Sequence, residues 1–91
     1  MKYAHRKVES LKLKDDIAND ERLQKALQVI NWDNVSDTLH TELNHLNNAI
    51  MYAERMIPEM MLLDRPSSCH TMIMERDQMI ERAQQIAIRT R

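Results

Sequence analysis

Glu42 and His45 are the first side chains in this sequence whose types and spacing could do chemistry. Residues i and i+3 share a helix face, and di-iron bundles present ligands through Glu-x-x-His pairs of this kind. Such a site needs two of these pairs and two further carboxylates, whereas the chain contains one pair. His45 also lies about 110° from the centre of the expected apolar face, so it points outwards. We predict no metal site and no cofactor.

Cys69 and His70 stand next to each other near the expected start of a helix, where a thiolate is stabilised by the helix dipole. Adjacent side chains on a helix point apart, so the two do not form a nucleophile and its base. His40 and His45 are five residues apart, which is the wrong spacing for chelating one ion from a helix. We therefore predict that the protein is not an enzyme and that Cys69 is a small, partly buried residue.

Arg76 falls near the centre of the apolar stripe expected in the last helix. An unpaired guanidinium at such a position would be costly, so it needs a carboxylate or a route to solvent. One hypothesis is a structural ion pair between Arg76 and Glu42, which flanks the facing stripe and would fix the helix register. The alternatives are an arginine that reaches solvent at the edge of the core, or an anchor for an anionic ligand.

Basic residues are concentrated in residues 1–14, which hold five lysines and arginines against one glutamate, although the whole chain has a net charge of −1. This segment is a candidate site for a small anionic ligand such as a nucleotide, through Tyr3, His5, Arg6 and Lys7. An aromatic residue among cations could also contact nucleic acid. The slightly acidic chain contains no recognition-helix signature, so nucleic-acid binding is the weaker alternative.

The elements that must position these residues are helices of a single domain, residues 1–91. Surface scaling for 10.8 kDa allows about 65% of the surface to be buried, enough for one modest core. With no glycine, the chain has no easy access to the positive φ angles of tight hairpins and phosphate loops. This argues against β-sandwiches, Rossmann domains and P-loop enzymes.

Compartment signals are few. No apolar run approaches the roughly 20 residues of a membrane span, and no apolar segment of a signal peptide follows the first residues. The single cysteine, Cys69, cannot form an internal disulfide. We expect a cytoplasmic protein that does not enter membranes.

Apolar periodicity predicts an all-α fold with two long antiparallel helices at about 34–57 and 68–89. Asp33 or Asn34 should cap the first, and Pro58 should end or kink it. Residues 58–63 should form a further short turn of helix between the two. Ser67 or Ser68 should cap the second. One or two shorter helices should precede them, the later one capped by Asn19 or Asp20 and followed by Trp32 against the core.

Several apolar residues fall outside the main stripes, and methionine is common both as gap filler and at adaptable binding surfaces. They predict a surface for a protein partner and a small bundle completed by homo-oligomerisation, with a dimer favoured. The predicted partner-binding residues are Met51, Met60, Met61, Met74 and Ile88. The expected function is that of a small non-catalytic regulator, inhibitor or adaptor, a class that phages and other mobile elements often encode.

Overall fold

The computed structural model describes residues 17–63 and 66–91, and every regular element in them is a helix. The predicted basic segment at residues 1–14, with Tyr3, His5, Arg6 and Lys7, lies outside the described residues. The all-α prediction is confirmed. The elements are α2 (Glu21–Val29), the short 3₁₀ helix η1 (Trp32–Asn34), α3 (Asp37–Leu62) and α4 (Pro66–Arg89).

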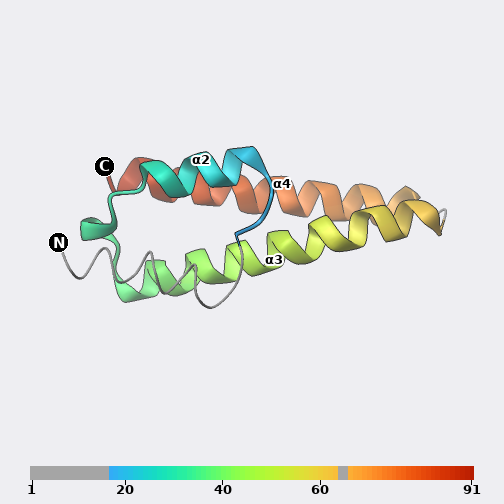
Figure 1. The fold of residues 1–91 in the computed structure, drawn as a ribbon, viewed down its shortest axis with the longest axis horizontal. Coiled ribbons are helices and arrows are strands. Elements are labelled where there is room, and N and C mark those ends of the chain that lie inside the picture. Colours follow the sequence, from blue (N-terminus) through green and yellow to red (C-terminus); the bar gives the residue numbers. More distant parts are fainter. Residues whose placement is uncertain (1–16, 64–65) are drawn as a thin grey trace.

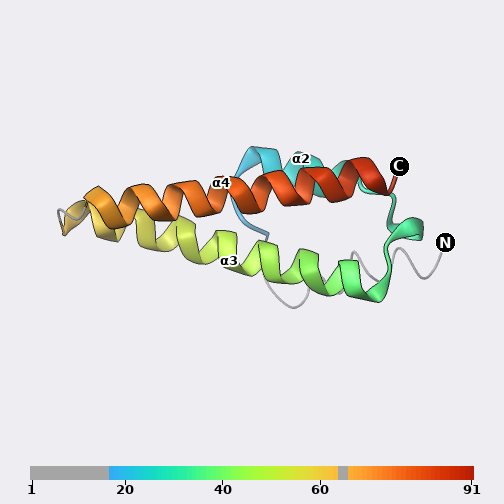
Figure 2. The same ribbon diagram turned by 180° about the vertical axis from the view of Figure 1, so that it is seen from behind.

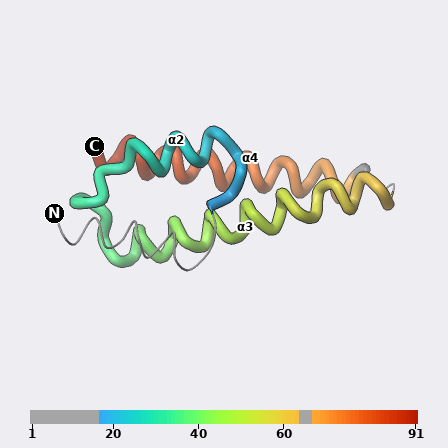
Figure 3. Tube along the Cα trace, in the orientation of Figure 1, coloured from blue at the N-terminus to red at the C-terminus, as the bar shows by residue number. Residues whose placement is uncertain are grey.

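The two long helices, α3 and α4, form an antiparallel hairpin (Figure 1). Helix α2 lies along the C-terminal half of α4 and runs in the same direction as α4, as the view from behind also shows (Figure 2). Beyond the start of α2, the hairpin continues as two helices without a described third one (Figure 3). The described chain therefore has a three-helix half and a two-helix half.

The core divides in the same way. We call the three-helix half proximal and the two-helix half, which contains the hairpin connection, distal. The proximal cluster joins α2, α3 and α4 and includes Leu23, Leu43, Ile50, Ile80 and Ile86, each at most 1% exposed. The distal cluster is smaller: Ala53, Ile57 and Cys69 are buried, with Met60, Met72 and Ile73 partly buried against them. The apolar stripes predicted for the two long helices thus face each other along the hairpin.

Helix α2 begins as predicted, because the Asp20 carboxylate accepts a hydrogen bond from the Arg22 backbone N–H at 2.9 Å. Helix α3 begins later than expected. Residues 32–34 form η1, and the Ser36 hydroxyl caps α3 by accepting from the Leu39 N–H at 3.2 Å. Trp32 packs partly buried against the proximal cluster, as expected, and its ring meets His40 edge-on at 6.2 Å.

The boundaries next to the hairpin connection differ from those predicted. The segment after Pro58 is helical, as expected, but it belongs to α3, which continues through Pro58 to Leu62 and does not end at residue 57. Pro58 is exposed, and the carbonyl that it leaves without a helical donor can be hydrated. Helix α4 begins at Pro66, ahead of the serines predicted to cap it. Proline is favoured at a first helical position, where its missing N–H costs nothing.

Candidate interaction surfaces

A buried amide joins α3 to the segment before α2. Asn47 is 0% exposed, and its Oδ1 accepts a hydrogen bond from the Ala18 N–H at 2.9 Å. On α3 two turns further along, Glu54 Oε1 accepts from the Asn19 N–H, also at 2.9 Å. These two contacts fix the start of α2 on α3. Asn47 was not among the residues predicted from the sequence, although an asparagine within an apolar stripe, three residues before Ile50, was a usable signal.

Arg22 ties the start of α2 to α4. Its guanidinium donates to Asp20 at 3.1 and 3.2 Å, and to Asp77 of α4 at 2.9 Å. The hydrogen bonds from Arg22 lower the pKa of both Asp20 and Asp77. Because Arg22 and Asp77 are about half exposed, the pair orients α2 more than it stabilises it.

The predicted ion pair between Arg76 and Glu42 is not the pair in the structure. Glu42 accepts two hydrogen bonds from Arg82, at 2.6 and 3.0 Å, and these lower its pKa. Arg76 contacts its neighbour Asp77 at 3.3 Å. The reason is register: if Arg82 faces Glu42 in an antiparallel hairpin, Arg76 faces a position six residues further along α3, about 9 Å away.

Arg76 nevertheless lies partly inside the molecule, with its side chain 24% exposed. Its Nε is buried and has no hydrogen-bond partner among the residues that the structure describes, and the same is true of Asn44 Oδ1 on α3. The expectation of an arginine near the edge of the core therefore describes its position better than the pairing with Glu42 does.

The five predicted partner-binding residues do not form one surface. Met51 packs partly buried against the proximal cluster, and Met60 packs against the distal cluster. Met61, Met74 and Ile88 are exposed, but Ile88 lies at the far end of α4 from the hairpin connection. The spacing of apolar residues along one helix does not show which of its sides are covered by neighbouring helices. Sequence periodicity therefore cannot tell an apolar residue on a second buried side from an exposed one.

Within residues 17–63 and 66–91, the end of the hairpin carries the most exposed large apolar side chains. Met61, Leu62 and Leu63 are 66%, 86% and 67% exposed. They follow each other at the end of α3, where the distal cluster is the nearest apolar core formed by the described residues. We call these three residues the hairpin end.

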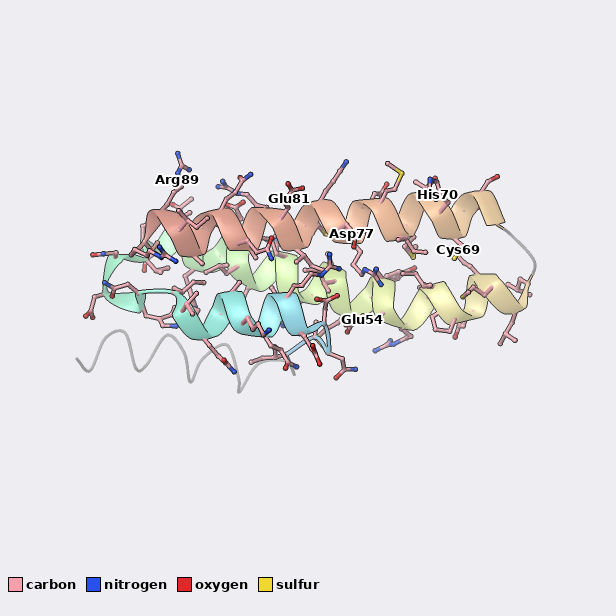
Figure 4. All side chains as sticks on the ribbon, turned by 90° about the horizontal axis from the view of Figure 1, so that it is seen from above. Glu54, Cys69, His70, Asp77, Glu81 and Arg89 are labelled. Atoms are coloured by element: carbon pink, nitrogen blue, oxygen red, sulfur yellow. The ribbon has the colours of Figure 1, made fainter. Side chains whose placement is uncertain are left out.

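Among the described residues, shallow grooves lie between α3 and α4 and between α2 and α4. The α3–α4 groove, ≈ 360 Å³, is lined by Ala49, Tyr52, Ala53, Met72, Glu75 and Met79. The α2–α4 groove, ≈ 400 Å³, has an apolar floor of Ala26, Val29, Ala87 and Ile88, with Arg22, Lys25 and Arg91 among its other lining residues. Figure 4 looks onto α4 and α2 side by side, with Asp77 directed towards α2 and with Glu81 and Arg89 directed away from it.

The residues considered for metal or nucleophile chemistry do not come together. His45 and His70 are exposed, whereas Cys69 is buried in the distal cluster. Within residues 17–63 and 66–91, no three histidine, cysteine or acidic side chains are placed to hold a metal ion. In the same residues, no helix combines the length and apolar character needed to cross a membrane.

The chain matches no protein-family model, no curated protein and no solved structure. Any statement of function therefore depends on the surfaces described above.

Proposed function

We propose that this chain is a small non-catalytic interaction protein that binds a partner protein through the hairpin end. The observation that carries the proposal is the exposure of three consecutive apolar side chains, Met61, Leu62 and Leu63. Clusters of exposed apolar side chains are typical of surfaces that bind other proteins. Because the distal cluster is small, burying these side chains in the monomer would require a further element on that half.

The partner is expected to offer an apolar groove that receives the hairpin end. Met61 is unbranched and adapts to the shape of such a groove, while the leucines supply most of the buried area. Met74, which is 49% exposed on α4, would extend the contact along the distal half. In this role the protein acts sterically, by covering or bridging a surface of its partner.

Substitution at the hairpin end tests this function. We expect a Leu62→Glu/Leu63→Glu variant to lose a partner that the wild-type protein retains on affinity purification. The variant should keep its helical circular dichroism, because both side chains are exposed. Gln85→Glu, at an exposed position on α4, is the matched control and should retain the partner. Equal recovery of the partner with both variants would contradict the proposal.

We also propose that a second copy of the chain covers the α3–α4 groove, completing a four-helix arrangement on the distal half. Tyr52, which is 53% exposed beside this groove, would be buried in such a dimer. We expect Tyr52→Glu to shift the protein from dimer to monomer in sedimentation velocity. A wild-type protein that remains monomeric at millimolar concentration would contradict this proposal, without affecting the one for the hairpin end.

A further inference from the structure

We propose that the α2–α4 groove is a second binding site, whose ligand is an amphipathic helix of another protein with acidic residues along its edges. The groove lies at the opposite end of the molecule from the hairpin end. This proposal is therefore independent of the function proposed for Met61, Leu62 and Leu63.

The floor of the groove is apolar, and two of its side chains are exposed to water. Val29 and Ile88 are 60% and 64% exposed, although each projects from a helix whose other apolar residues are mostly buried. Ala26 and Ala87 lie between them and are buried, so the floor is low and flanked by two larger side chains. An apolar strip of this shape between two helices can receive the apolar face of a third helix.

The packing of α3 against α2 and α4 is a precedent for a helix that binds between these two helices. Helices α2 and α4 lie side by side, and α3 packs beneath them in the view of Figure 4. Across that packed side, Glu42 of α3 forms a two-bonded contact with Arg82 of α4. An incoming helix in the α2–α4 groove would repeat this arrangement on the other side, with its carboxylates on Lys25 of α2 and on Arg91 just after α4.

The charges around the groove select an acidic ligand. Lys25 on α2 and Arg91 just after α4 are both exposed, and neither forms an ion pair with another described residue. Arg22 is already balanced by Asp20 and Asp77. Among the described residues no aspartate or glutamate lines the groove, and Glu81 of α4 points away from α2. Complementary charge would set both the orientation and the association rate of an acidic helix.

Selection of binding peptides from a display library tests this site. The library consists of 18-residue amphipathic helices in which the positions flanking the apolar face vary among acidic, basic and neutral residues. We expect selection on the full chain to enrich glutamate and aspartate at those positions. Selection of neutral or basic edges, or failure to enrich any helix, would overturn the proposal.

Variants then establish where a selected peptide binds, with fluorescence anisotropy as the measurement. We expect Lys25→Glu/Arg91→Glu to weaken binding of the acidic peptide by about tenfold or more and to favour a peptide with lysines in place of the acids. Ile88→Asp should abolish binding of both peptides. Leu62→Glu at the hairpin end is the control and should leave the affinity unchanged.

Fold and ligand class are checked in the same series. Circular dichroism should show the same helix content for every variant, because Lys25, Ile88 and Arg91 are exposed. Undiminished peptide binding by folded Lys25→Glu/Arg91→Glu would overturn the proposal. Chemical-shift perturbation by a fatty acid at the groove residues, with none by any acidic peptide, would also overturn it. The ligand of the groove would then be a small amphiphile.

Discussion

The side chain of Asn47 connects α3 with the segment that leads into α2, in a region with no direct access to water. A buried backbone N–H must find an acceptor, and the Asn47 amide oxygen supplies it for Ala18. Together with Glu54, which accepts from the Asn19 N–H, Asn47 holds the segment before α2 against α3. Its neighbour Asn48 is exposed on the same helix and offers a matched comparison.

We predict that Asn47→Ala destabilises the protein by about 2 kcal/mol, because the Ala18 N–H loses its acceptor inside the core. Asn48→Ala should change the stability by less than about 0.5 kcal/mol. Urea unfolding followed by circular dichroism measures both. If the two variants are equally stable, the hydrogen bond to Ala18 does not hold the start of α2.

Asp77 gives a pH-dependent prediction. Its pKa is lowered mainly by the hydrogen bond from Arg22, with a further contribution from Arg76. A carboxyl group with a lowered pKa in the folded state stabilises the protein above its unfolded pKa, and this contribution is lost as the pH falls through the folded value. For Asp77 the loss should therefore occur below about pH 4.

We expect Asp77→Asn to cost about 0.5 kcal/mol at pH 7, since both partners are about half exposed, and to cost nothing near pH 2. Unfolding free energies measured across this pH range provide the test. Glu81→Gln, which removes an exposed charge on the same helix, should show no comparable pH dependence. A cost for Asp77→Asn that persists at pH 2 would mean that packing, not charge, explains it.

Among the helices, α3 contains a proline, Pro58, in its interior. Pro58 cannot donate a hydrogen bond to the carbonyl of Glu54, yet α3 continues to Leu62. The helix tolerates it because Ile57 is buried in the distal cluster beside it and holds the backbone in place. Residues after Pro58 thus remain helical through packing on one side and hydration on the other.

We predict that Pro58→Ala stabilises the protein by about 1 kcal/mol or more, because alanine restores the donor and has the highest helix propensity. Thermal unfolding should show a higher Tm for Pro58→Ala than for the wild type. Glu59→Ala, at the next exposed position, should change Tm little. A lower Tm for Pro58→Ala would show that the proline stabilises this part of α3.

The helices themselves could be predicted from sequence because their apolar stripes repeat at helical spacing and Asp20 is a strong cap. Further helix after Pro58 could be predicted as well, but its continuity with α3 could not, because that depends on tertiary packing that a local rule does not contain. The partner of Glu42 could not be predicted either. It depends on the hairpin register, which places Arg82 and not Arg76 opposite Glu42.

At the scale of the whole molecule, the described chain is asymmetric. The proximal half has three packed helices, whereas the distal half has two and carries the exposed apolar residues of the hairpin end (Figure 1). The sequence predicted an apolar binding surface but placed Met51 and Met60 on it, because a helical wheel does not show which sides neighbouring helices cover. The three-dimensional arrangement concentrates the most exposed residues at the hairpin end instead.

The central claim, that the hairpin end binds a protein partner, is tested most directly by photo-crosslinking in the cells that produce the protein. A photoreactive amino acid replaces Leu62 in one variant and Gln85 in a control variant, both at exposed positions. We predict that position 62 yields one discrete adduct, that position 85 does not, and that Leu63→Glu in the position-62 variant removes the adduct. The same adducts from both positions, or no adduct from position 62, would contradict the account.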